Sequence, residues 1–307
     1  MNKQEKITYK YDGSLVKKAA YASVCVAAVL IAIKFFAWHT TNSLSLQATL
    51  IDSLLDAVAS VINMLAIRHA HRPPNDDYRF GHGKSEALAA IGQSLFIVAS
   101  AMWLIYEGFH RLFNHEVISG SSVGIVVMVI SMALTYILLR FQKHVIERTN
   151  SAAIKADSVH YHSDFLINGG VIISLTLSFY FHLPWFDALF GMSIALYILY
   201  TAWQVSSESF GILMDKELEP DIRDKIIAIA TKHPEVHGTH QVKTRSSGFR
   251  TFIQLHLELD GAITLADAHK IADEVENDIL KAFPEAEVII HEDPIGLTEH
   301  PSDLRNK

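Results

Sequence analysis

The chain has little charge and almost no cysteine. Of its 307 residues, 19% are charged and one is a cysteine, whereas 50% are hydrophobic. Soluble domains carry about 25% charged residues, and the lone Cys25 excludes a disulfide framework. A basic stripe is also lacking, so nucleic-acid binding is not expected. No cleavable signal peptide is apparent, because the first apolar run continues for a full membrane span.

The shortage of charge is uneven along the chain. It lies between Ala19 and Phe210, while the segment from Asp215 to Lys307 resembles an ordinary soluble protein in composition. We therefore expect a transmembrane domain over residues 1–212 and a soluble, cytoplasmic domain over residues 213–307.

The first domain contains six apolar runs long enough to cross a bilayer, which takes roughly 20 residues as a helix. They span residues 15–38, 44–67, 87–112, 123–141, 159–181 and 187–205. Lys and Arg cluster before the first run and in the loops after the second and fourth runs, whereas the opposite loops hold almost none. By the positive-inside rule, both termini are cytoplasmic and the protein is a multi-pass protein of the cell membrane.

The second domain has the pattern of a small α/β fold. Pro220 begins a helix that reaches about Lys232, and a second helix spans residues 265–283. Three strands are expected at residues 240–245, 251–259 and 287–291, and the second alternates strictly between apolar and polar residues. The element order is therefore αββαβ.

Two of the six runs carry ionisable pairs. Asp52 and Asp56 lie in the second run and His160 and Asp164 in the fifth, each pair four residues apart. That spacing puts both members on one helix face. Left uncompensated, the four side chains would cost roughly 8–10 kcal/mol in a bilayer. A divalent cation compensates them, and a tetrahedron of mixed His and carboxylate ligands suits Zn²⁺.

These residues sit in motifs that resemble those of the cation diffusion facilitator family, within it the bacterial zinc and ferrous-iron efflux pumps. The motifs are Leu50-Ile-Asp52-Ser-Leu-Leu-Asp56, Phe80-Gly-His82-Gly-Lys84-Ser-Glu86, Ala156-Asp-Ser-Val-His160-Tyr-His-Ser-Asp164, Phe252-Ile-Gln-Leu-His256-Leu-Glu and Val288-Ile-Ile-His291-Glu-Asp293-Pro. The resemblance covers nearly the whole chain. It implies a homodimer, with no enzymatic activity, that exports divalent metal in exchange for protons by alternating access. Zn²⁺ is the first candidate, with Fe²⁺ and Cd²⁺ as further possible substrates.

The resemblance also implies metal sites. It assigns the transport site to Asp52, Asp56, His160 and Asp164, the same four residues that the spacing selects. It assigns a second, cytoplasmic site, binuclear and near the dimer interface, to His240, His256, His269, His291 and Asp293.

Two further assignments concern the loop after the second run. Close relatives bind a third metal there, but this chain has Asn75 and Tyr78 where they have Asp and His, so Asp76 or Asp77 would have to join His82 as ligands. The family also uses the positions of Lys84 and Asp215 for a charged interlock at the dimer.

Three other functions remain to be weighed. An intramembrane metalloenzyme would need a general base beside an open metal position, and no run contains a His-Glu-x-x-His motif. A passive channel needs weaker binding than a four-ligand site provides. The main alternative is a metal sensor or assembly scaffold of the same fold, which would be signalled by a lost transport ligand; all four are present.

Overall fold

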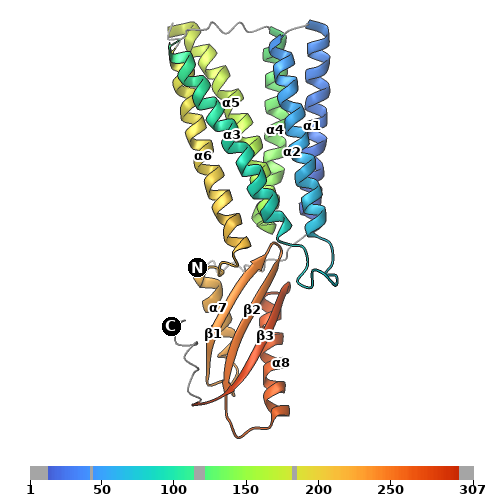
Figure 1. Cartoon of the computed structure of the whole chain (residues 1–307), viewed down its shortest axis with the longest axis vertical. Helices are drawn as coiled ribbons and strands as arrows, with labels where there is room; N and C mark the ends of the chain where they lie inside the picture. The colour runs from blue at the N-terminus through green and yellow to red at the C-terminus, as the bar shows by residue number, and fades with distance from the viewer. Residues whose placement is uncertain (1–12, 42–43, 114–121, 182–184, 297–307) are drawn as a thin grey trace, which may run out of the picture. The chain divides into compact units, whose positions relative to one another are not determined.

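The computed structural model describes residues 13–41, 44–113, 122–181 and 185–296, in six long helices followed by a smaller α/β part (Figure 1). The described residues divide into two compact units between Phe210 and Gly211. The helices are α1 Gly13–Thr41, α2 Leu44–Ala70, α3 Ser85–Phe113, α4 Ser122–Thr149, α5 Ala152–Phe181 and α6 Trp185–Leu213.

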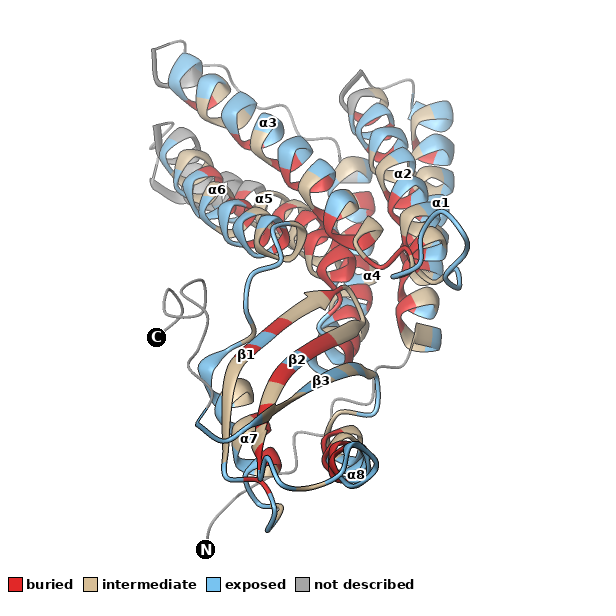
Figure 2. Cartoon of the chain, turned by 60° about the horizontal axis from the view of Figure 1, so that its bottom comes forward, coloured by how far each residue is buried: buried red, intermediate tan, exposed pale blue. Residues whose placement is uncertain are grey.

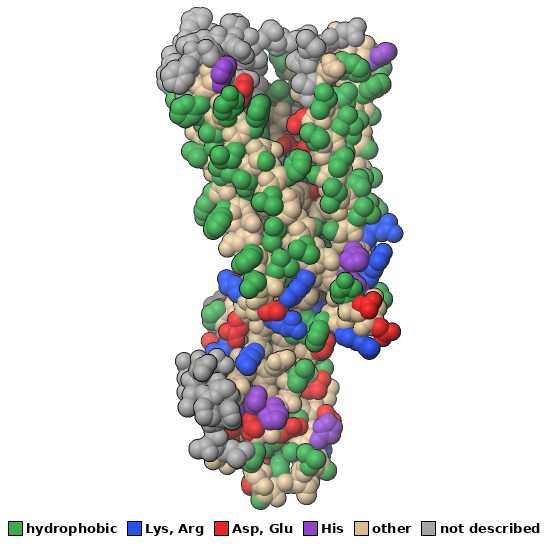
Figure 3. Space-filling model, viewed as in Figure 1, with side chains coloured by type: hydrophobic (Ala, Val, Ile, Leu, Met, Phe, Trp, Pro, Cys, Tyr) green, Lys and Arg blue, Asp and Glu red, His purple; other side chains and the backbone are tan. Residues whose placement is uncertain are grey.

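The surface of the helical unit is apolar. Phe36, Trp103 and Trp203 are 71%, 67% and 72% exposed, and hydrophobic side chains cover the face shown in Figure 3. Among the described residues, five helices, all but α5, are long and apolar enough to cross a membrane. Such a surface suits a bilayer, and the expected helical transmembrane domain is confirmed.

Several helices extend beyond the apolar runs that predict them. We expected α4 to end near Phe141, but it continues to Thr149, and α5 begins at Ala152 rather than near residue 159. Charged residues with good helix propensity continue the last turns of α4, where Lys143 and Glu147 pair at i, i+4. Asn150 then takes a left-handed conformation, φ 52°, and ends the helix. Only Asn150 and Ser151 separate α4 from α5.

The helices pack in a defined order. α1 packs against α2 and α4, and α5 packs against α3 and α4. α3 and α6 contribute to one buried apolar cluster, which contains Ile97 and Ala101 of α3 and Ala195, Ile198 and Ala202 of α6.

The second unit is the expected αββαβ domain. It contains α7 Pro220–Ala230, β1 Gly238–Ser247, β2 Arg250–Leu259, α8 Leu265–Ala282 and β3 Ala286–Pro294. The sheet order is β1-β2-β3, with β1 antiparallel and β3 parallel to β2. Thr264 caps α8 by accepting a hydrogen bond from the backbone N–H of Asp267.

Helices α7 and α8 cover one face of the sheet, and within the described residues no helix of this unit covers the other face. Ile253, Leu255, Leu257 and Leu259 of β2 are at most 2% exposed and form one core with α7 and α8, and buried residues run along β2 in Figure 2. The polar residues that alternate with them therefore lie on the opposite, helix-free face of the sheet.

Candidate metal sites

The first candidate site joins α2 to α5. His160 Nε2 lies 3.0 Å from Asp56 Oδ1 and 3.8 Å from Asp164 Oδ2. One ligand atom from each of these three residues lies within 4.8 Å of the others. A nitrogen and two carboxylate oxygens that converge in this way can hold a divalent cation.

Asp52 lies one turn before Asp56 on α2, and its carboxylate is outside this three-residue cluster. The next residue, Ser53, accepts a hydrogen bond of 2.6 Å from Lys34 Nζ, and Lys34 also donates to the backbone oxygen of Thr49. Lys34 therefore ties α1 to α2 beside Asp52. The structure brings three of the four expected transport ligands together and leaves the fourth one turn away.

The neighbours of the cluster on α5 take other roles. The Tyr161 hydroxyl lies 3.0 Å from Ser60 Oγ on α2, and Tyr161 is 2% exposed. His162 points to another face, where its ring meets Tyr197 of α6 at 6.1 Å. His162 is therefore not a member of the metal cluster, as its helical position predicts.

The helical unit is hollowed where acidic side chains gather. Figure 3 shows acidic atoms inside a gap between its helices. The side chains of Asp56 and Asp164 are 19% and 29% exposed, so the cluster is accessible while His160, at 10%, is mostly enclosed.

The second candidate site lies on the helix-free face of the sheet. In the strand register, His256 of β2 is directly opposite His240 of β1 on one side and His291 of β3 on the other. Their rings are in contact, with centroids 5.0 Å and 4.6 Å apart. Three imidazoles thus form one row across the sheet.

A β-bulge in β1 determines which residue of β1 lies in this row. The β1–β2 register shifts between His240 and Lys243, and Gln241 in the bulge has φ 49°. Continuing the pairing from the turn, where Ser247 pairs with Arg250, would place Gln241 opposite His256. The extra residue brings His240 to that position instead.

Asp293 of β3 connects the row. Its Oδ2 lies 2.7 Å from His256 Nδ1 and 3.4 Å from His240 Nε2, while its Oδ1 lies 3.3 Å from His291 Nε2. One carboxylate therefore faces histidines with both of its oxygens, which is the geometry of a bridging ligand. Glu258, which the sequence did not indicate, lies 3.9 Å from His240 Nε2.

His269 does not join this cluster within the chain. It lies on α8 with its side chain 73% exposed, and its Nε2 is 3.8 Å from Asp273. The residues of α8 that face the sheet are Ala268, Ile271 and Ala272, so His269 points away from it.

The loop between α2 and α3 does not gather the expected ligands. Asp76 is 94% exposed and pairs with Arg79 at 2.9 Å, and neither metal-binding cluster of the described residues includes Asp76, Asp77 or His82. The His82 ring is 8% exposed and packs at 4.7 Å against both His69 and Tyr78. The expected metal partners of His82 are thus replaced by aromatic neighbours.

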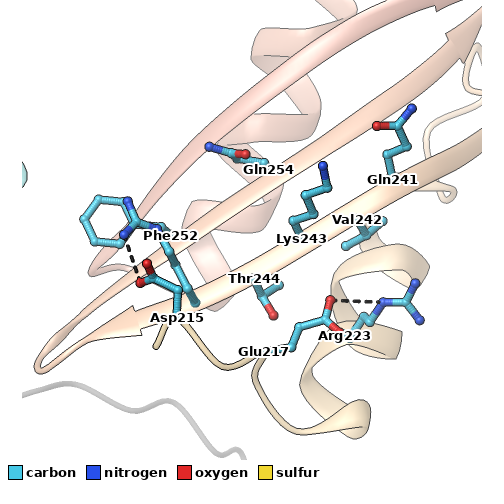
Figure 4. A pocket seen from close by; sticks show the side chains of 10 residues that line it. Asp215, Glu217, Arg223, Gln241, Val242, Lys243, Thr244, Phe252 and Gln254 are labelled. Atoms are coloured by element: carbon cyan, nitrogen blue, oxygen red, sulfur yellow. Dashed lines mark hydrogen bonds and ion pairs between the residues drawn. The ribbon is translucent and has the colours of Figure 1, made fainter. Parts of the chain in front are cut away.

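A cavity of about 460 Å³ borders β1 in the second unit (Figure 4). Two ion pairs line it: Arg245 with Asp215 at 3.1 Å, and Arg223 with Glu217 at 3.6 Å. Its acids face arginines, and neither cluster of possible metal ligands among the described residues contributes a residue to its lining. Asp215, expected to interlock with Lys84, has Arg245 as a partner within its own unit.

The chain matches family models over both units. Residues 20–214 match the cation efflux transmembrane domain, and residues 218–295 match the cytoplasmic domain of cation efflux proteins. The chain belongs to the cation efflux family. This family, the cation diffusion facilitators, is the one that the sequence motifs resemble, and its members are transporters of cations rather than enzymes.

Individual relatives agree with this family assignment. The chain is 44% identical to the cation-efflux pump FieF of Escherichia fergusonii over 286 residues, 93% of this chain and 95% of that one. It is also 44% identical to the FieF pump of Serratia proteamaculans over 283 residues, 92% and 94% of the two chains.

Among solved structures, the chain resembles the zinc form of the zinc transporter CzrB and the metal-bound C-terminal domain of CzcD from Thermotoga maritima. The sequence identities are 31% and 32%, and the matches cover 28% and 27% of this chain and 99% and 100% of those, with TM-scores of 0.26. The family match over residues 20–214 and the apolar helices identify this cation efflux protein as a multi-pass membrane protein.

Proposed function

We propose that this cation efflux protein exports a divalent metal, Zn²⁺ first and Fe²⁺ or Cd²⁺ second, from the cytoplasm in exchange for protons. The observation that carries the proposal is the convergence of Asp56, His160 and Asp164 inside the helical unit, within 4.8 Å of one another. Asp52 completes the set as the fourth ligand, reached by a small rotation of α2 or of its side chain.

The ligand chemistry favours Zn²⁺ among common divalent ions. An imidazole with carboxylates in a four-coordinate site suits Zn²⁺, and Fe²⁺ and Cd²⁺ accept the same donors. Ca²⁺ and Mg²⁺ prefer six or more oxygen ligands and no imidazole. The metal is the cargo of this site and not a resident cofactor.

Proton exchange follows from the same ligands. An imidazole must be neutral and a carboxylate ionised to hold a metal, so protons and metal compete for the site. We infer that His160 carries at least one exchanged proton, since imidazole is the side chain that ordinarily titrates near neutral pH. An unchanged pH dependence of the residual transport in a His160→Ala variant would contradict this role.

In the cytoplasmic domain, we propose a binuclear site held by His240, His256, His291 and Asp293. The carboxylate of Asp293, which faces His240 and His256 with one oxygen and His291 with the other, would bridge two ions. Because His269 points away from this face in its own chain, it can contribute only from a second copy. The proposed site therefore accords with a homodimer, and both chain termini would be cytoplasmic.

The test is metal uptake into proteoliposomes under an imposed pH gradient, comparing the wild type with Asp56→Ala and His162→Ala. We expect Zn²⁺ flux that follows the gradient, is lost in Asp56→Ala and persists in His162→Ala, because His162 faces α6 rather than the cluster. Competition by Fe²⁺ and Cd²⁺ in the same vesicles ranks the metals. A wild type that moves no divalent metal under any gradient, yet binds it in the cytoplasmic domain, would favour the sensor or scaffold instead.

A further inference from the structure

A second carboxylate of α5 is buried completely and belongs to neither metal-binding cluster. Asp157 lies three residues before His160 and has no exposed surface. Its Oδ2 accepts hydrogen bonds from Ser23 Oγ at 2.5 Å and Gln142 Nε2 at 2.7 Å, and its Oδ1 accepts one from Gln93 Nε2 at 3.1 Å. These bonds restrain the helices that they join, because the loss of any donor leaves a buried acceptor oxygen with fewer partners, which costs free energy.

The three donors come from three different helices. Ser23 belongs to α1, Gln142 to α4 and Gln93 to α3. α1 and α4 pack against each other, and α4 continues into α5 through a two-residue connection. α3 packs against α5 and α2. The Gln93–Asp157 bond therefore crosses the contact between α3 and the group formed by α1, α4 and α5.

A second polar contact links α3 to the same end of α5. Ser151 Oγ donates to Glu86 Oε2 at 2.8 Å, and both residues are buried. Glu86 and Gln93 are seven residues apart and so lie on one face of α3. Further along, Val159 and Ile167 of α5 pack against the apolar cluster that contains Ile97 and Ala101 of α3. When α3 moves relative to α5, apolar side chains can exchange contacts with little loss of free energy. The polar contacts cannot do so, and they must break.

The end of the unit that these bonds hold is closed. Ala153, Ile154 and Ala156 of α5 have no exposed surface. The side chains of Asp56 and Asp164, deeper along the helices, are 19% and 29% exposed. The metal cluster is thus accessible from the side of the hollow and shut off from the side of the α4–α5 connection.

We propose that Asp157 and Gln93 form a latch that closes the α4–α5 end of the helical unit beneath the transport site. Asp157 is a positioning residue: it holds α3 against α5 and need not touch the metal. Opening this end to admit an ion requires Gln93 to separate from Asp157 and Glu86 to separate from Ser151. The bonds from Ser23 and Gln142 to Asp157 move with α5 and stay intact. The inference rests on the proposed function for the side of the membrane to which this end opens, because the end is cytoplasmic only in the proposed topology.

The experiment measures access to a single cysteine rather than transport, so it succeeds or fails independently of metal flux. The background is Cys25→Ala with Ala153→Cys as the reporter, in inside-out membrane vesicles treated with a membrane-impermeant maleimide. We expect Gln93→Leu to raise the labelling rate about tenfold, because the loss of one buried hydrogen bond shifts the equilibrium between closed and open forms by about that factor. Equal rates in Gln93→Leu and its parent would overturn the latch.

Two comparisons separate a latch from a loss of structure. Gln142→Leu removes a donor to the same carboxylate from α4, which moves with α5, and we expect its labelling to stay close to that of the parent. If Gln142→Leu raises labelling as much as Gln93→Leu, the bonds only maintain packing and the proposal is wrong. A second reporter, Asn168→Cys, lies one turn beyond Asp164 on α5 and is partly exposed. Its labelling, measured from the opposite side, should fall in Gln93→Leu, whereas partial unfolding would raise labelling at both reporters.

Discussion

Replacing Asp293 by Asn should abolish metal binding in the cytoplasmic domain at concentrations that saturate the wild type. The carboxylate faces three histidines with its two oxygens, and its side chain is only 20% exposed. The Asn side chain keeps the size and one oxygen but removes the charge. At 4 Å and an effective dielectric constant of about 20, a divalent cation and one carboxylate attract each other by roughly 8 kcal/mol.

Most of that attraction is offset by the lost hydration of ion and carboxylate. If a third of it remains, about 2.7 kcal/mol, the affinity falls by about 100-fold. Both ions should weaken together, because one carboxylate serves both. Sites that lacked a shared ligand would instead lose one ion and keep the other.

The assay is equilibrium competition for Zn²⁺ with a chromophoric chelator, on the full chain in detergent. Asp56→Ala serves as the background, so that the transport site does not contribute. The matched control is Glu292→Gln, an acid of the same strand whose side chain alternates to the other face of the sheet. An Asp293→Asn variant that binds the same number of ions as its parent, with the same affinity, would refute the bridging geometry.

Four further substitutions, one of them a surface control, test the transport site and the two cores. Asp164→Asn should abolish gradient-driven Zn²⁺ flux in proteoliposomes but leave Zn²⁺ binding by the cytoplasmic domain intact; loss of both would point to misfolding. Leu257→Ala, at a position with no exposed surface, should destabilise the cytoplasmic domain by about 2–5 kcal/mol in a circular-dichroism denaturation. Leu265→Ala, at an 83% exposed position, should stay within about 0.5 kcal/mol of wild type, and equal effects would contradict the assigned core. Tyr161→Phe, which loses the hydroxyl's contacts with Ser60 Oγ and with the Ser23 backbone oxygen, should lower the stability of the helical unit by about 1 kcal/mol in detergent; an unchanged thermal midpoint would show that these contacts are not stabilising.

The helices and the convergence of Asp56, His160 and Asp164 could be predicted because both depend on local periodicity. Apolar run length predicts the spans, and the i, i+4 spacing of His160 and Asp164 predicts a shared helix face. The helix ends could not be predicted in the same way. α4 passes beyond its apolar run to Thr149 because charged residues also form helix.

The cytoplasmic site could be predicted only in part, since it depends on strand register. Sequence alternation places His256 on the polar face of β2, but it cannot show which residue of β1 lies opposite. The bulge at Gln241 decides that, and nothing in the local sequence marks it. Asp157 was missed for a related reason: its donors are up to 134 residues away along the chain.

The short connection between α4 and α5 has a consequence for how the transporter responds to its surroundings. A connection of two residues is too short for the helices to move independently, so a tilt of α5 must also move α4. On the outer surface of α4, the side chains of Tyr136 and Ile137 are 53% and 65% exposed. If that surface lies in lipid, the ligands on α5 are mechanically coupled to the bilayer through α4. Membrane thickness and lateral pressure would then influence how readily the metal cluster changes its access, without any lipid reaching the metal.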